Sequence, residues 1–289
     1  MSLRGKVLFV TGGARGIGAA VAAEAASRGA RVALVGIEPE ELEARAAELG
    51  EGHIHIEADV TDLDSMRGAA DRTVDELGGI DMVLANAGIA TYGSVENIDP
   101  EAFKRAIDVN VTGVFYTAHV AMPQLLANRG WFGVVGSIAS YAPLPGGASY
   151  NASKAGVELF TRALRGEVGW RGVTAASIHP SWIDTAMVQE AGELSSFRER
   201  RERLPWPVRA TTTPERCAEL IVDGAEARKD RIFIPPSARL IFWLRNLLGS
   251  RFGEAIMARE SPEIVPQMDA EIAQLGRSVS ARNAEINRR

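Results

Sequence analysis

The stretch Tyr150-Asn-Ala-Ser-Lys154 places a phenol and an ammonium group four residues apart. Residues with this spacing share one face of a helix, so the two side chains are expected to be neighbours. A nearby positive charge favours phenolate, which would lower the pKa of Tyr150 and fit it to give and take protons. Alone, the pattern also fits an ordinary surface pair, so its surroundings decide its interpretation.

A glycine-rich turn follows a buried-looking strand near the start of the chain. Residues 6–11 are rich in aliphatic side chains, Gly12, Gly16 and Gly18 follow, and an alanine-rich helix is expected over 19–28. Glycines let the backbone approach a phosphate, and a helix N-terminus offers free N–H groups and positive potential. This turn predicts a dinucleotide-binding site, with a tight turn that binds no ligand as the alternative.

Strand-like and helix-like patterns alternate along the chain. This alternation predicts an α/β fold with a doubly wound parallel sheet of Rossmann type in a single domain. Gly12, Asn86, Ser137 and Pro180 follow expected strands, and ligands bind at the carboxyl ends of such strands. The expected strands cover residues 6–11, 31–36, 53–60, 80–85, 131–136, 173–179 and 231–235.

The dinucleotide-binding domain is expected at residues 1–236, with a substrate lid at about 181–212 and a C-terminal helical extension at 237–289. Within the extension, residues 238–248 are apolar over more than half of a helix circumference and have arginines at the rim. We expect this helix to pack on the domain or on a second subunit. A wall of the substrate pocket and a helix lying on a membrane surface are the alternatives.

Composition limits the possible partners. The chain is 46% hydrophobic and 24% charged, as globular proteins are, and its net charge of −5 argues against nucleic acid. Cys217 is the single cysteine, and the first residues lack a signal-peptide pattern, so we expect a cytoplasmic protein. No apolar run in the sequence is long enough to span a bilayer. His53 and His55 have no third ligand nearby, so no metal is expected.

The end of the second expected strand bears on the choice of cofactor. An acidic residue there would bind the adenosine ribose 2′-hydroxyl of NAD, but the sequence has Gly36, followed by Ile37 and Glu38. Arg15, inside the glycine turn, could meet a 2′-phosphate. We therefore expect NADP or NAD with a preference for NADP, and a Glu38 carboxylate that reaches the ribose is the alternative.

Together these motifs resemble the short-chain dehydrogenase/reductase family. Thr-Gly-x-x-x-Gly-x-Gly at 11–18, Asn-Ala-Gly at 86–88, a glycine–serine pair at 136–137 and Tyr-x-x-x-Lys at 150–154 occur in the family's order. The resemblance covers about residues 3–235. It implies a Rossmann-type domain that transfers a hydride between a nicotinamide cofactor and an alcohol or ketone.

The resemblance also implies roles for individual residues. Tyr150 would exchange a proton with the substrate oxygen, while Lys154 would hold the nicotinamide ribose and lower the Tyr150 pKa. Ser137, rather than Ser140, would hydrogen-bond the substrate oxygen, and Asn110 would position the lysine and a proton-relay water. Besides Tyr150 and Lys154, the implied cofactor-binding residues are Gly12, Arg15, Ile17, Gly18, Asp59, Val60, Asn86, Gly88, Pro180, Ile183 and Thr185.

The family's glycine-rich C-terminal end is missing, so we expect a homodimer through helices at about 100–128 and 149–171 rather than a tetramer. Large apolar side chains on or after the lid favour a hydrophobic secondary alcohol or ketone as the substrate. The alternative is a non-catalytic protein that senses a dinucleotide, but such a protein would not need a proton relay. The apolar side chains in question are Trp182, Met187, Phe197, Trp206, Phe242 and Trp243.

Overall fold

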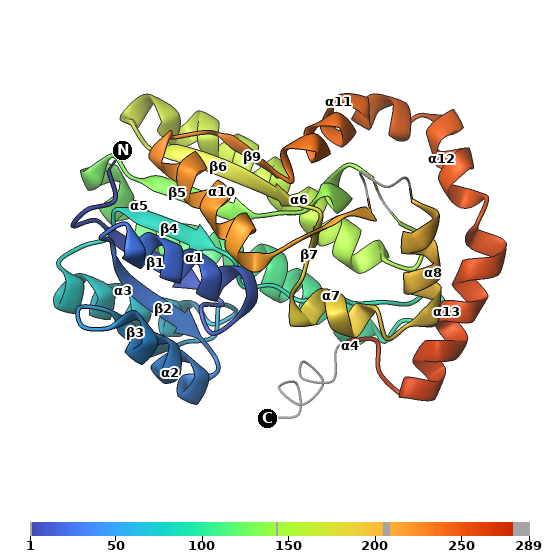
Figure 1. Cartoon of the computed structure of the whole chain (residues 1–289), viewed down its shortest axis with the longest axis horizontal. Coiled ribbons are helices and arrows are strands. Elements are labelled where there is room, and N and C mark those ends of the chain that lie inside the picture. The colour runs from blue at the N-terminus through green and yellow to red at the C-terminus, as the bar shows by residue number, and fades with distance from the viewer. Residues whose placement is uncertain (1, 143, 205–208, 280–289) are drawn as a thin grey trace.

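A parallel seven-stranded sheet in the order β3-β2-β1-β4-β5-β6-β9 forms the centre of the protein (Figure 1). The computed structural model describes residues 2–142, 144–204 and 209–279. Because the strand order reverses between β1 and β4, the predicted doubly wound α/β fold is confirmed. The strands are β1 (Val7–Thr11), β2 (Arg31–Gly36), β3 (Ile54–Glu57), β4 (Met82–Ala85), β5 (Trp131–Val135), β6 (Thr174–Pro180) and β9 (Arg231–Ile234).

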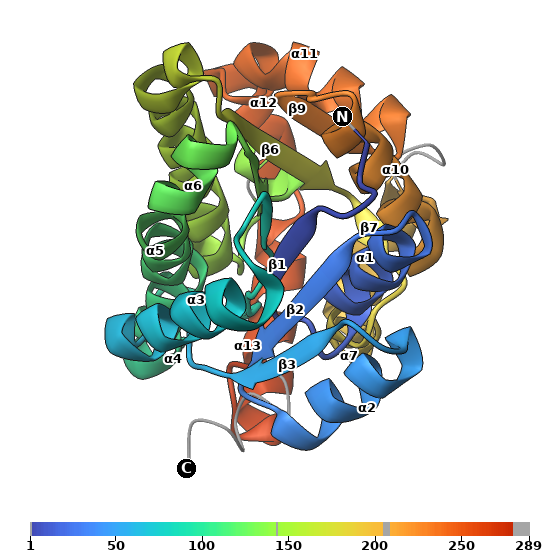
Figure 2. The same ribbon diagram turned by 90° about the vertical axis from the view of Figure 1, so that its left-hand side faces the viewer.

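Helices cover both faces of the sheet, which explains why its strands are nearly continuous aliphatic runs (Figure 2). Val7 and Phe9 of β1 pack into the core on one face, and Leu8 and Val10 pack into the core on the other. The first core is covered by α3 (Leu63–Leu77), α5 (Gly113–Asn128) and α6 (Ala148–Val168). The second is covered by α1 (Gly16–Ser27), α2 (Pro39–Leu49) and α10 (Pro214–Glu226).

Two predicted elements differ from the structure near the site. β3 ends at Glu57, because Asp59 turns the chain by accepting hydrogen bonds from the backbone and side chain of Thr61, each at 2.8 Å. The helix expected from about residue 100 to 128 consists of α4 (Pro100–Ile107), a π-helical turn (Asp108–Thr112) and α5. Such turns are frequent at functional sites, and this one contains Asn110.

The segment predicted as a lid contains β7 (Trp182–Ile183), α7 (Ala186–Ala191), α8 (Ser195–Arg203) and β8 (Thr211–Thr212), and β7 pairs with β8. Its residues 205–208, which include Trp206, lie outside the described residues, as do residues 280–289 of the extension. The described part of the extension contains α11 (Arg239–Leu248), α12 (Arg251–Ala258) and α13 (Ser261–Leu275). In the part of the chain that the structure describes, no helix has the length and apolarity to cross a bilayer.

The last helix, α13, returns along the lid (Figure 1). Its Glu271 accepts a hydrogen bond from the backbone N–H of Ser195 at 3.0 Å, and a carboxylate at a helix N-terminus is stabilising, here at the start of α8. Tyr92, in the loop after β4, packs against a small apolar cluster of α13 that consists of Ile264, Met268 and Ile272. The extension therefore contacts both the segment predicted as a lid and the loop after β4.

Candidate active site

A cleft at the carboxyl ends of the strands collects nearly all the residues that the sequence singled out. Gly18 and Asn110 are the two predicted site residues that do not line it. Among the described residues, no group of three or more His, Cys, Asp and Glu side chains could hold a metal ion. The predicted residues that line the cleft are Gly12, Arg15, Ile17, Asp59, Val60, Asn86, Gly88, Ser137, Tyr150, Lys154, Pro180, Ile183 and Thr185.

The glycine turn forms one end of this cleft. A Cβ at Gly18 would come within 2.2 Å of the Gly12 carbonyl oxygen, so glycine is needed there for α1 to approach the end of β1. Asn86 fixes the turn, because its Nδ2 donates to the carbonyl oxygens of Thr11 and Gly12, each at 3.0 Å. No side chain of the described residues caps the N-terminus of α1. The free N–H groups and the close backbone suit the pyrophosphate of a dinucleotide.

The other end holds the three groups that could handle a proton. Tyr150 and Lys154 lie one turn apart on α6, with Lys154 Nζ 5.7 Å from the centroid of the Tyr150 ring. Ser137, directly after β5, is hydrogen-bonded to the Tyr150 side chain. Lys154 Nζ donates to the Val135 carbonyl oxygen at 2.9 Å. The neighbouring Ser140 donates instead to the Lys154 carbonyl oxygen at 2.8 Å, so it supports α6.

Burial shifts the pKa values of both α6 groups. It raises the pKa of Tyr150, although the hydrogen bond with Ser137 acts in the opposite direction. This differs from the expectation that Lys154 lowers the Tyr150 pKa. Burial also lowers the pKa of Lys154 to about 8, because the ammonium loses its hydration. The lysine therefore supplies its full positive charge only below that pH.

Asn110 lies behind the cleft and joins the loop after β4 to α6. Its Oδ1 accepts from the Ile89 N–H at 2.8 Å, and its Nδ2 donates to the Ile89 carbonyl oxygen and to Ser153 Oγ, each at 2.9 Å. Asn110 thus reaches α6 through Ser153. Gly88 separates Asn110 from Lys154, since a Cβ there would lie 3.1 Å from Asn110 Oδ1 and 3.4 Å from Lys154 Nζ.

Sequence reasoning missed Arg105 of α4, which lines the cleft near Asp59. Arg105 Nη2 lies 3.2 Å from Asp59 Oδ2, and its Nη1 donates to Thr61 Oγ1 at 2.9 Å. Burial by itself raises the pKa of Asp59, but the hydrogen bonds from Thr61 and the charge of Arg105 hold it below the ordinary value. No signal in the sequence points to Arg105, because α4 and Asp59 meet only in the folded chain.

Tyr92 and Glu190 were missed at the Tyr150 end of the cleft. Burial, followed by repulsion from the ionised forms of Tyr150 and Glu190, raises the pKa of Tyr92 far above its ordinary value. No local pattern in the sequence distinguishes Tyr92. Glu190 belongs to a charged lid sequence in which nothing distinguishes it.

Arg15 and Glu38 meet at the end of β2. Arg15 Nη2 lies 3.7 Å from Glu38 Oε1, and both residues line the cleft. Glu38 also stands beside Gly36, because a Cβ on that glycine would lie 3.3 Å from Glu38 Oε2. The two residues from which the sequence predicted the choice of cofactor therefore form one ion pair.

Known proteins that resemble this chain are dehydrogenases and reductases. The family model described as short chain dehydrogenase matches residues 6–195. A (-)-trans-carveol dehydrogenase of Rhodococcus erythropolis is 36% identical over 234 residues, which are 73% of this chain and 84% of the relative. A 3-alpha-(or 20-beta)-hydroxysteroid dehydrogenase of Mycobacterium bovis is 33% identical over 233 residues, which are 77% of this chain and 89% of the relative.

Solved structures agree with these relatives. A short chain dehydrogenase from Burkholderia cenocepacia in complex with NADP has a TM-score of 0.73 and 31% identity, covering 81% of this chain and 97% of that one. A 3-ketoacyl-(acyl-carrier-protein) reductase from Brucella melitensis complexed with NADH has a TM-score of 0.73 and 26% identity, covering 81% and 98%. With its glycine turn, serine, tyrosine and lysine on one cleft, the chain belongs to the short-chain dehydrogenase/reductase family and is an NAD(P)-dependent enzyme that acts on CH–OH groups.

Proposed function

We propose that this enzyme transfers a hydride between a nicotinamide cofactor and a hydrophobic secondary alcohol or ketone, with Tyr150 as the proton donor and acceptor. The observation that carries the proposal is the hydrogen bond between Ser137 and Tyr150, with Lys154 one turn further along α6, in the cleft that begins at the glycine turn. The cofactor supplies the hydride chemistry. The chain's own residues bind, orient and move the proton.

Tyr150 and Ser137 would hydrogen-bond a single substrate oxygen. During reduction this oxygen gains negative charge, which donors that are already oriented stabilise. Ser137 Oγ accepts from the Ala139 N–H at 3.1 Å, and its own hydroxyl proton would turn from Tyr150 to the substrate oxygen. Tyr150 would then donate its proton, and the ammonium of Lys154 would stabilise the phenolate that remains. Oxidation of an alcohol uses the same groups in reverse.

The other cleft residues would hold the cofactor in the order in which they lie along the sheet edge. The N-terminus of α1 with Gly12 and Ile17 would bind the pyrophosphate, and Asp59 and Val60 would flank the adenine. Lys154 would bind the ribose next to the nicotinamide. Asn86 and Gly88 would form the adjoining wall, and Pro180, Ile183 and Thr185 would contact the carboxamide.

We propose NAD as the preferred cofactor, which departs from the preference for NADP expected from Gly36. The support for this change is the ion pair between Glu38 and Arg15, with a distance of 3.7 Å. A carboxylate at this end of the cleft can accept hydrogen bonds from ribose hydroxyls, but it repels a 2′-phosphate. Arg15, which would attract that phosphate, is partly neutralised by the same carboxylate.

The side chains at the substrate end of the cleft favour an alicyclic secondary alcohol as the substrate. Its lining includes the apolar side chains of Ile183, Met187 and Val188 beside Tyr92. The relatives named for carveol and for hydroxysteroids point to the same class. Two aromatic residues of the predicted lid pack against this lining. The Phe197 ring lies 5.4 Å from the Trp182 ring and 6.0 Å from the Tyr92 ring, centroid to centroid.

The outward faces of α5 and α6 support a homodimer. Phe115 of α5 is 47% exposed and Leu159 of α6 is 63% exposed, so burying them in a subunit contact is favourable. A Leu159→Glu variant should run as a monomer in light scattering, while the Leu275→Glu control on α13 should keep the mass of the wild type. A tetrameric mass for the wild-type chain contradicts this proposal.

The function is tested by following reduced nicotinamide while the purified chain is given NAD⁺ and a panel of carveol, cyclohexanol and hydroxysteroids. We expect turnover of at least one alicyclic alcohol, and reduction of the matching ketone by NADH. Open-chain primary alcohols of similar size serve as the matched controls. Tight cofactor binding without turnover in either direction would instead support the non-catalytic dinucleotide-sensing protein.

A further inference from the structure

The outward face of α11 and α12 is apolar. Of the thirteen exposed large hydrophobic side chains among the described residues, six lie within residues 240–256. Those on α11 follow the spacing of one helix face, and those on α12 are one turn apart. Their exposed fractions are 62% for Leu240, 67% for Trp243, 40% for Leu244, 54% for Leu247, 67% for Phe252 and 45% for Ile256.

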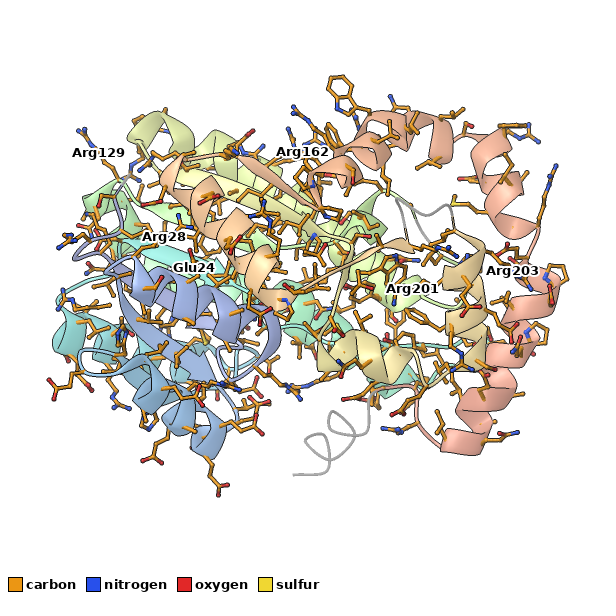
Figure 3. The ribbon with its side chains drawn as sticks, viewed as in Figure 1. Glu24, Arg28, Arg129, Arg162, Arg201 and Arg203 are labelled. Carbon is orange, nitrogen blue, oxygen red and sulfur yellow. The ribbon has the colours of Figure 1, made fainter. Side chains whose placement is uncertain are left out.

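The opposite side of α11 fixes the helix to the domain. The Phe242 ring lies 5.3 Å from the Tyr141 ring and 5.6 Å from the Phe233 ring, centroid to centroid. The Arg231 and Arg245 guanidinium groups lie over the Phe242 ring, at 5.1 and 4.1 Å from its centroid. Because Phe242 faces inward, the stripe that begins at Leu240 faces away from the domain. Figure 3 shows side chains of α11 and α12 extending from the edge of the molecule.

Positive charge surrounds this apolar face. The exposed charged side chains of residues 237–259 are three arginines and Glu254, a net charge of +2, whereas the whole chain carries −5. Arg239, Arg251 and Arg259 are exposed, and the Arg239 guanidinium lies 5.9 Å from the centroid of the Trp243 ring. Tryptophan is enriched at membrane–water interfaces, and arginines at the rim of a buried apolar face pair with lipid phosphates.

A second copy of the chain fits this face poorly. In a symmetric contact the same patch lies on both sides, so the three exposed arginines of one copy would lie near the three of the other. Such like-charge contacts are costly. An anionic lipid surface offers the complementary charge together with an apolar layer that is deep enough for the exposed side chains.

We propose that α11 and α12 dock the enzyme on anionic membrane surfaces, with the six apolar side chains at the acyl boundary and the arginines at the phosphates. The docking face is joined to the catalytic region, because Phe242 packs on Tyr141, four residues after Ser137. A hydrophobic substrate dissolved in lipid would then be concentrated near the cleft. Only that consequence rests on the proposed function, whereas the docking itself does not.

Co-sedimentation of the full chain with vesicles tests the proposal without any substrate. We expect binding to vesicles of phosphatidylcholine mixed with phosphatidylserine, little binding to phosphatidylcholine alone, and release by salt. A Trp243→Ser/Leu247→Ser/Phe252→Ser variant should lose binding. An Arg239→Gln/Arg251→Gln/Arg259→Gln variant should bind on the order of 100-fold more weakly, given about 1 kcal/mol per arginine.

The matched control is Trp170→Ser, which removes another exposed tryptophan that has an arginine beside it, Arg171 at 5.8 Å. This variant should bind vesicles as the wild type does, and far-UV circular dichroism should show that every variant is folded. The proposal is overturned if the wild type does not bind anionic vesicles at low salt, or if the triple serine variant still binds them. If the mass of the oligomer in solution fell in the triple serine variant, the face would instead be a contact with a second copy.

Discussion

Glu158 Oε2 lies 3.3 Å from His179 Nε2, and both side chains are buried, at 6% and 0% exposure. Glu158 is one turn beyond Lys154 on α6, and His179 precedes Pro180 at the end of β6. His179 Nδ1 lies 3.4 Å from the Ser137 carbonyl oxygen. The pair therefore forms a layer directly behind the proton-handling groups. Burial raises the pKa of Glu158, but the nearby His179 ring outweighs it and holds the pKa at about 2.

This pair predicts how the free energy of unfolding depends on pH. Because the pKa of Glu158 is below its ordinary value of 4.5 in the folded chain, the ionised carboxylate stabilises the fold above that pH, by roughly 3 kcal/mol. That contribution is lost as the pH falls toward about 2. A Glu158→Gln variant should therefore be clearly less stable in urea unfolding at neutral pH, with the difference shrinking in acid. A difference that is independent of pH would contradict an ionised Glu158 in the folded chain.

The proton role that we propose for Tyr150 predicts a specific loss of activity. In a Tyr150→Phe variant the ring remains but the proton donor is gone, so kcat should fall roughly 100- to 10,000-fold, as for loss of a general acid. The cofactor dissociation constant should change little, because the phenol proton does not hold the pyrophosphate. Tyr116→Phe on α5 is the control for removing a tyrosine hydroxyl elsewhere. Turnover that survives in Tyr150→Phe would exclude Tyr150 as the acid/base.

The buried charge of Lys154 is expected to lower the free energy of unfolding. Its pKa is lowered by burial to about 8 from 10.5, so the folded state holds its charge at a penalty below pH 8, and stability rises as the pH passes from about 8 to 10.5. Lys154→Met should unfold at higher urea concentration than the wild type at neutral pH, by about 1–2 kcal/mol, because the lost hydrogen bond to Val135 offsets part of the gain.

The same variant should be inactive, and its stability advantage should disappear as the pH rises through that range. Lys104→Met, which removes an exposed lysine of α4, is the control, since an exposed ammonium has no burial penalty to relieve. A Lys154→Met variant that is less stable than the wild type at neutral pH would show that the lysine is not destabilised by burial.

The ion pair of Arg15 and Glu38 predicts the choice of cofactor. Titration of the wild type should give tighter binding of NADH than of NADPH. Glu38→Gln removes the charge that repels a 2′-phosphate and frees Arg15 to attract it, so the preference should move toward NADPH by about tenfold, or about 1.4 kcal/mol. Glu40→Gln, on the exposed first turn of α2, should leave the ratio unchanged. Tighter binding of NADPH by the wild type would contradict the proposal.

Local patterns in the sequence predicted the sheet, the glycine turn and the shared face of Tyr150 and Lys154. Each depends on residues that are close along the chain, where helix and strand periodicity fixes which side chains are neighbours. Asn86 and Ser137 could be placed near them because parallel strands end at one edge of the sheet. The family resemblance then supplied a role for each position.

Tertiary structure alone decided which distant residues act on these groups. Arg105 beside Asp59, His179 beside Glu158, and α13 against Tyr92 join segments whose proximity no local pattern records. The pKa of Tyr150 was predicted in the wrong direction for the same reason, since it depends on how much water the folded cleft excludes. The sequence determined the kind of chemistry through short-range spacing, and the fold set its electrostatics because burial and long-range contacts exist only once the chain has packed.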